Sequence, residues 1–87
     1  MGEGDLWVEV GAWVSEEAVE AVAEALRGMG ASGVIIRPWP NGVQVSTFFP
    51  PSQNPERKRR RLERFLGRLS SWGLEPGPGK VWTKVWE

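Results

Sequence analysis

The stretch GVIIRPWPNGVQVSTFFP, residues 33–50, decides the fold of this chain. Residues 34–37 predict a strand that Pro38 ends, because proline has no backbone N–H to donate to a neighbouring strand. Residues 40–42, Pro-Asn-Gly, predict a tight turn, and Asn-Gly is typical of β-hairpins. The returning strand is expected over residues 43–49, with Gln44, Ser46 and Phe48 on the face opposite to Val43, Val45, Thr47 and Phe49.

A strand and a helix are expected on each side of this hairpin. Upstream, residues 6–14 alternate between apolar and other residues, which predicts a strand. Ser15 is suited to cap the helix that follows, over residues 15–30, because its hydroxyl can accept a free backbone N–H. Downstream, residues 54–73 predict a second helix and residues 80–86 a last strand.

The order β-α-β-β-α-β predicts an α+β domain with the ferredoxin-like fold. Such a fold has a four-stranded antiparallel sheet, and right-handed crossovers place both helices on one face. A chain of 87 residues is the length of one domain, so we expect residues 1–87 to form a single one. The other face of the sheet is then open to solvent or to a partner.

The composition excludes several classes of function. The chain has no cysteine and no histidine, which removes thiolate metal sites and the Ser-His and Cys-His nucleophile systems. The loop at residues 77–79, Gly-Pro-Gly, has no helix after it and so does not predict a phosphate cradle. We therefore expect no catalytic residue, no metal site and no cofactor in this chain.

The sequence also predicts a cytoplasmic protein that does not enter a membrane. No stretch approaches the roughly 18 apolar residues that a membrane helix needs. The acidic start, residues 1–5, is unlike a signal peptide.

The helix-free face of the sheet is where we expect a partner to bind. A monomer rarely leaves several large aromatic side chains on one open face, and tryptophan is enriched at binding hot spots. The alternative is that the terminal loops cover these rings or that some of them lie at the sheet margin. The predicted partner-binding residues are Trp7, Trp13, Phe48, Trp82 and Trp86.

A protein is the partner that this face favours over RNA. RNA-binding sheets of this topology carry an aromatic signature on the third strand, which residues 43–49 lack. The face is also expected to hold Glu9 and little positive charge beyond Lys84, whereas phosphate attraction dominates nucleic-acid affinity. Weak self-association through the same face is a further alternative.

A run of cations in the second helix is the other candidate site. Residues 56–68 hold seven basic residues against two acidic ones, whereas residues 1–30 hold seven acidic residues against one basic. Such a run can bind nucleic acid, although consecutive residues spread around a helix axis. The alternative is pairing with acids of the first helix, namely Glu16, Glu20 and Glu24. The residues concerned in either case are Arg57, Arg60, Arg61 and Arg64.

Five segments of the chain are similar to one known family. They are WVEV (7–10), SEEAVEAV (15–22), GASGVII (30–36), FFP (48–50) and VWTKVWE (81–87). The first three resemble the start of the PrmA family, the bacterial methyltransferases of ribosomal protein L11. The fourth resembles that family's YFP-type end of strand three, and the fifth resembles the segment before its EDW motif. Residues 37–39, RPW, stand where the family usually has acidic residues.

This resemblance implies a substrate-recognition domain. In that family the corresponding region is N-terminal, has a ferredoxin-like fold and binds the ribosomal protein. It presents the lysines and terminal amine of that protein to a separate S-adenosylmethionine domain. The resemblance therefore implies that the cofactor and the catalytic residues lie outside this chain, which would be part of an enzyme.

Overall fold

The computed structural model of the chain describes residues 6–87. The acidic segment 1–5, which the sequence distinguishes from a signal peptide, lies outside the described residues. The elements are β1 (Trp7–Val14), α1 (Val19–Gly28), β2 (Ile35–Trp39), β3 (Gly42–Phe49), α2 (Pro55–Leu69) and β4 (Lys80–Trp86). A 3-10 turn precedes α1 at Glu16–Ala18, and another precedes α2 at Pro51–Gln53. A third follows α2 at Ser70–Trp72.

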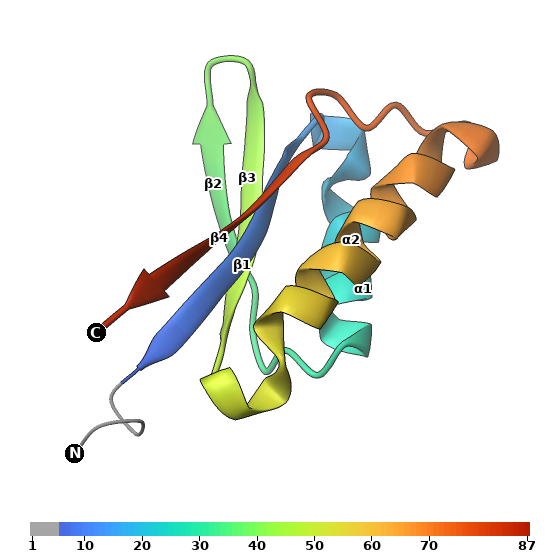
Figure 1. Cartoon of the computed structure of the whole chain (residues 1–87). Coiled ribbons are helices and arrows are strands. Elements are labelled where there is room, and N and C mark those ends of the chain that lie inside the picture. Colours follow the sequence, from blue (N-terminus) through green and yellow to red (C-terminus); the bar gives the residue numbers. More distant parts are fainter. Residues whose placement is uncertain (1–5) are drawn as a thin grey trace.

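The four strands form one antiparallel sheet in the order β2-β3-β1-β4. Both helices lie on the same face of this sheet, as Figure 1 shows. This arrangement confirms the predicted α+β, ferredoxin-like fold. It places β1 and β3 in the centre and leaves β2 and β4 as the edges.

The hydrophobic core fills the space between the sheet and the two helices. From the sheet, Val10 and Val45 are fully buried, and Phe49 is almost so. From the helices, Leu26 and Leu62 are fully buried against them. Burial of each such side chain contributes about 1.5–3 kcal/mol, so this layer supplies most of the stability of a small domain.

Lys58 closes the core at the end of α1. Its Nζ donates to the carbonyl oxygen of Met29 over 2.8 Å and lies 4.8 Å from the centre of the Phe49 ring. A cation suits the carbonyl end of a helix and the face of an aromatic ring. One cation of the basic run therefore has a structural role that the sequence did not reveal.

The expected cap at Ser15 is wrong. Its side chain makes no capping hydrogen bond, and a 3-10 turn precedes α1. Instead the Ser15 hydroxyl donates to the carbonyl of Glu75, and the Ser15 N–H donates to the carbonyl of Pro76 over 3.0 Å. Gly77 allows this approach, because a Cβ there would lie 2.6 Å from the Ser15 nitrogen. Ser15 thus fastens the loop that leads into β4.

The second strand does not end at Pro38 as the sequence predicted. It continues to Trp39, which lies opposite Gly42, so Pro40 and Asn41 form the turn. Proline is tolerated here because β2 is an edge strand with one neighbour. The extension brings Trp39 into the sheet.

The two ends of α2 differ in how well the sequence predicted them. Asn54 caps the helix as its place before Pro55 indicates, and its Oδ1 accepts from the N–H of Arg57 over 3.3 Å. At the other end, Trp72 belongs to the 3-10 turn after the helix and is 57% exposed. The helix expected over residues 54–73 therefore ends at Leu69, before Trp72.

Candidate functional site

The helix-free face consists of the side chains that point away from α1 and α2. In the centre of the sheet Gly11 lies between Ser46 on β3 and Trp82 on β4. Towards one end of β1, Glu9 lies between Phe48 and Lys84. Towards the other end the neighbours in order are Arg37, Gln44, Trp13 and Lys80.

Glu9 forms a buried polar centre under this face. Glu9 lies on the helix-free face as expected, but it is only 4% exposed, so its charge is not open to solvent there. One carboxylate oxygen accepts from the Ser46 hydroxyl over 2.7 Å, and the other accepts from the Trp86 indole N–H over 3.0 Å. Because both oxygens are occupied, Glu9 fixes the position of the Trp86 ring.

Trp82 covers the middle of the sheet by packing over Gly11. A Cβ on Gly11 would lie 2.7 Å from both the Trp82 ring and the Ser46 Cβ, so only glycine leaves room for the indole. Trp82 is half-buried, and within residues 6–87 its buried indole N–H has no hydrogen-bond partner. Of the predicted partner-binding tryptophans, it is the one with the clearest packing role.

Three predicted residues form a group that we call the terminal cluster: Trp7, Phe48 and Trp86. Trp7 lies opposite Trp86 across β1 and β4, and the Phe48 and Trp86 rings meet edge-on with centres 6.4 Å apart. Trp7 and Trp86 are 45% and 43% exposed. The Nζ of Lys84 lies 4.1 Å from the centre of the Trp86 ring, so a cation borders the cluster.

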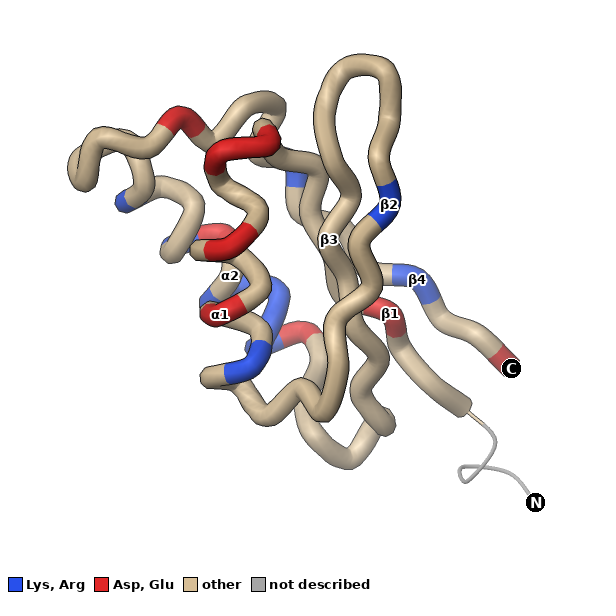
Figure 2. The backbone as a smooth tube through the Cα atoms, turned by 180° about the vertical axis from the view of Figure 1, so that it is seen from behind, with Lys and Arg blue, Asp and Glu red and all other residues tan. Residues whose placement is uncertain are grey.

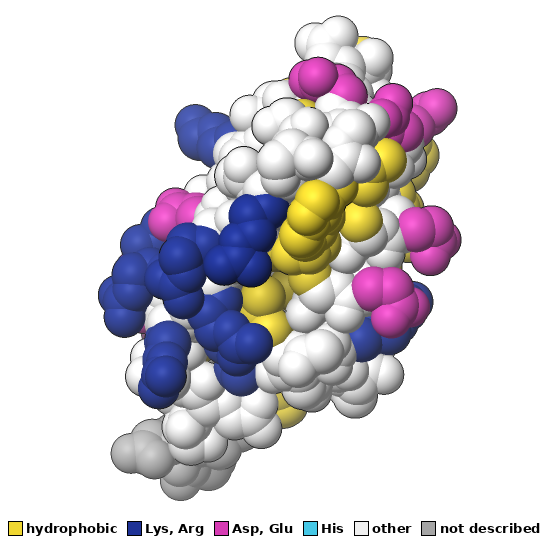
Figure 3. Space-filling view, turned by 90° about the vertical axis from the view of Figure 1, so that its right-hand side faces the viewer, with side chains coloured by type: hydrophobic (Ala, Val, Ile, Leu, Met, Phe, Trp, Pro, Cys, Tyr) yellow, Lys and Arg dark blue, Asp and Glu magenta, His cyan; other side chains and the backbone are white. Residues whose placement is uncertain are grey.

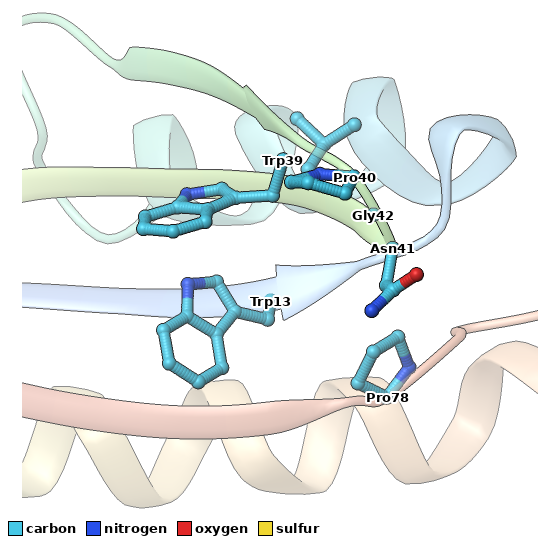
Figure 4. A pocket seen from close by; sticks show the side chains of 7 residues that line it. Trp13, Trp39, Pro40, Asn41, Gly42 and Pro78 are labelled. Atoms are coloured by element: carbon cyan, nitrogen blue, oxygen red, sulfur yellow. The ribbon is translucent and has the colours of Figure 1, made fainter.

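The third exposed predicted residue, Trp13, belongs to a second group at the β2–β3 turn, the hairpin cluster. Figure 4 shows Trp13 and Trp39 side by side, with Pro40, Asn41 and Pro78 around the open end. The two ring centres are 6.1 Å apart, and the residues line a hollow of about 240 Å³. The Trp13 indole N–H donates to Gln44 over 3.3 Å.

Sequence reasoning missed Trp39 because the strand was expected to end one residue before it. In the structure Trp39 is 53% exposed and extends the hairpin cluster to the edge of the sheet. Continuing the period-two alternation through Pro38 would have placed it on this face.

The charge of the helix-free face also differs from the expectation. Arg37 lies opposite Gln44, and Lys80 lies opposite Trp13, so Lys84 is joined by two further cations. All three are exposed, whereas Glu9 is buried. The accessible part of this face therefore combines aromatic rings with positive charge.

The cations of α2 do not pair with α1 as the alternative predicted. Among residues 6–87 the ion pairs lie within each helix: Arg27 with Glu24, Arg59 with Glu56 and Glu63, and Arg60 with Glu56. The hydrogen bond from Arg59 lowers the pKa of Glu56, and the same bond raises the pKa of Arg59. Figure 2 marks the acidic residues along α1 in red and the cations along α2 in blue.

Residues 6–87 contain no cluster of histidine, cysteine or acidic side chains that could hold a metal ion. None of the helices in the same range has the length and apolar character needed to cross a membrane.

Comparison with known proteins gives one informative similarity. No protein-family model matches the chain. A ribosomal protein L11 methyltransferase from Levilactobacillus brevis is 29% identical over an alignment of 102 residues, which covers 91% of this chain and 32% of that protein. The chain thus spans about a third of the length of this curated relative. The similarity agrees with the family that the sequence segments resemble.

Proposed function

We propose that the chain is the substrate-recognition domain of a ribosomal protein methyltransferase, and that it binds the ribosomal protein on its helix-free face. The observation that carries this proposal is the gathering of four exposed tryptophans on one face of the sheet: Trp7, Trp13, Trp39 and Trp86. Exposed indoles at this density are typical of protein-binding surfaces. The similarity to an L11 methyltransferase supports the class of partner.

The hydrogen bonds beneath the rings support a recognition role. Glu9 holds Trp86, and Gln44 holds Trp13, so both clusters contain a ring of fixed orientation. A side chain that is already ordered loses less conformational entropy when a partner binds. The terminal and hairpin clusters, with the Trp82 indole between them, would contact two parts of one partner.

Methyl transfer would take place in a separate S-adenosylmethionine domain of the cytoplasmic enzyme. About two thirds of the relative's length lies outside the match, which leaves room for such a domain. We expect the 87-residue chain alone not to bind S-adenosylmethionine. Isothermal calorimetry with the cofactor tests this, and tight binding would contradict the assignment of the chain to recognition alone.

Calorimetric titration with purified ribosomal protein L11 tests the binding face. Trp7→Ala and Trp39→Ala each remove one exposed ring, one from each cluster, and we expect at least about tenfold weaker binding. Trp72→Ala is the matched control, because it removes an equally exposed indole after α2. Its affinity for L11 should equal that of the unchanged chain.

Two results would overturn the proposal. An equal loss of affinity in the Trp72→Ala control would mean that the helix-free face is not the contact surface. Absence of L11 binding to the unchanged chain, with sedimentation that depends on concentration, would instead assign the exposed rings to self-association. Thermal melting of each variant separates both results from unfolding.

A further inference from the structure

A regular row of arginines runs along one face of α2, on the helix side of the sheet. Arg57, Arg61, Arg64 and Arg68 follow one another at intervals of four, three and four residues. This spacing places them on one face of a helix, over a length of about 16 Å. We call these four residues the arginine stripe. The consecutive cations of the basic run do spread around the helix axis, as expected. The four arginines of the stripe nevertheless share one face.

The arginine stripe is distinct from the other cations of α2. Arg59 and Arg60 pair with acids of the same helix, and Lys58 bonds to the end of α1. The four stripe residues are exposed, and within residues 6–87 none of them forms an ion pair. Arg57 also lies in the first turn of α2, where a cation opposes the helix dipole. Their charge is therefore available to a ligand.

The stripe borders a groove between the two helices. Arg61, Arg64 and Arg68 line one wall, together with Phe65, and the other wall comes from α1 through Ala25 and Met29. The groove has a volume of about 380 Å³. Figure 3 shows a patch of cations beside an apolar strip, with acidic side chains on the opposite flank. Repulsion from those acids would confine an anionic ligand to the α2 side.

An exposed aromatic ring lies beside the stripe. Trp72 belongs to the 3-10 turn that follows α2 and is 57% exposed. Its ring meets Phe65 edge-on with centres 5.6 Å apart, and Phe65 lines the same groove as the arginines of the stripe. The indole is therefore anchored on one edge and accessible elsewhere. Cations in a row with an accessible aromatic ring beside them are the pattern by which proteins hold single-stranded nucleic acid.

We propose that the arginine stripe and Trp72 bind single-stranded RNA. The guanidinium groups contact successive phosphates, since arginine recognises phosphate oxygens through paired N–H donors. A base stacks on Trp72, which requires a strand whose bases are free of a duplex. The carboxylates of an acidic peptide would satisfy the charges but supply no ring to stack on Trp72. This site lies on the opposite side of the sheet from the proposed protein-binding face and does not depend on it.

Fluorescence anisotropy with a labelled single-stranded RNA of about 12 nucleotides tests the proposal across a series of salt concentrations. The double variant Arg61→Gln with Arg64→Gln should bind at least about tenfold more weakly. The slope of log affinity against log salt should fall by about 1.4, since each lost phosphate contact on a single strand contributes about 0.7. Trp72→Ala should weaken binding and leave the salt slope unchanged.

Lys80→Gln with Lys84→Gln is the matched control, because it removes the same charge from the helix-free face. Affinity and slope should stay close to those of the unchanged chain. Equal losses of RNA affinity in the two double variants would mean that only the net charge of the chain matters. That result would overturn the proposed site. Should the Arg61 and Arg64 variant fail to fold by circular dichroism, Arg57→Gln with Arg68→Gln removes the same charge from the two ends of the stripe.

The arginine stripe could instead bind an acidic peptide, a duplex or a second copy of the chain. Each of these results would contradict the proposal. Competition by polyglutamate at equal charge would assign the stripe to an acidic peptide. Equal affinity for a duplex of the same sequence would remove the stacking role of Trp72. Concentration-dependent sedimentation that high salt abolishes, without RNA binding, would mean that the basic flank of one copy meets the acidic flank of another. Trp7→Ala should retain RNA binding, so failure of L11 binding and failure of RNA binding are distinguishable.

Discussion

The two faces of the sheet bury their residues by different means. On the helix side Val10 and Phe49 lie under α1 and α2, in a core made of apolar side chains. On the helix-free side Glu9 and Ser46 are buried to a similar degree, yet they are polar and bonded to each other and to the indole of Trp86. The helix-free face therefore also buries side chains. Its tryptophans cover polar groups that hold them in place.

This difference separates stability from recognition. Apolar burial under the helices is non-directional and contributes free energy in proportion to its area. A buried carboxylate with two hydrogen bonds contributes less net free energy but fixes where a ring points. The helix side should therefore carry the larger share of stability.

The largest effect should come from the adjacent residues Phe48 and Phe49, whose rings lie on opposite faces. Phe49 is 1% exposed, so Phe49→Ala should lower the free energy of unfolding by about 3–5 kcal/mol. Phe48 is half-buried in the terminal cluster, so Phe48→Ala should cost about 1 kcal/mol, the scale of one aromatic pair. Urea denaturation of both variants measures the difference.

Phe49→Leu serves as the control for this pair, because it keeps the site apolar and should lose less stability than alanine. If Phe48→Ala destabilises the chain as much as Phe49→Ala, the helix-free face is a second core and the comparison fails.

A smaller loss is expected from the polar centre. Glu9→Gln keeps one oxygen to accept from the Trp86 N–H, and its amide N–H can donate to the Ser46 hydroxyl in place of the present bond. Two hydrogen bonds to a charged group thus become neutral ones, which are about half as strong, so the loss of stability should be about 1–2 kcal/mol. The weaker bond to the indole N–H should also shift the tryptophan emission spectrum. An unchanged spectrum together with unchanged stability would mean that Glu9 does not hold the ring.

Gly11→Ala tests the packing of Trp82 over the middle of the sheet. The added methyl group would approach the indole and Ser46 to 2.7 Å, so the ring must move outward. Overpacking of this kind costs about 1–3 kcal/mol. Gly67→Ala on α2, where a Cβ meets nothing within 4 Å, is the control and should not destabilise the chain. A Gly11→Ala variant as stable as the unchanged chain would show that Trp82 has room to adjust.

The sequence predicted the layout of the fold but not the burial of the helix-free face. Period-two alternation in β1 assigned Glu9 and Trp7 to the correct face, because backbone geometry alone determines it. The burial of Glu9 depends instead on which residues lie opposite it, and Gly11 makes room for Trp82 only when three strands are in register. Register across a sheet is set by contacts that are distant in sequence, which no local pattern reveals.

Edge position likewise explains why the prediction that Pro38 ends its strand was wrong. A proline stops a strand that needs a partner on both sides, but β2 has one neighbour and continues to Trp39. The arginine stripe was readable in advance from helical spacing, whereas its freedom from ion pairs followed only from which acids Arg59 and Arg60 contact.

The smallest effect on stability should come from Glu56, an exposed acid on α2. Glu56, in the first turn of α2, accepts a hydrogen bond from Arg59, which holds the pKa of Glu56 below its ordinary value of 4.5. A carboxyl group whose pKa falls on folding contributes stability above its unfolded pKa and loses it as the pH falls through the folded pKa.

Because Glu56 is exposed, we expect Glu56→Gln to change the urea midpoint slightly at neutral pH and less still in acid. Urea midpoints of Glu56→Gln measured from about pH 7 down to about pH 3 test this dependence. The midpoint of Glu9→Gln at about pH 7 gives the comparison with a buried carboxylate. A larger midpoint shift in Glu56→Gln than in Glu9→Gln at neutral pH would reverse the order, and the polar centre under the tryptophans would then contribute less than a surface ion pair.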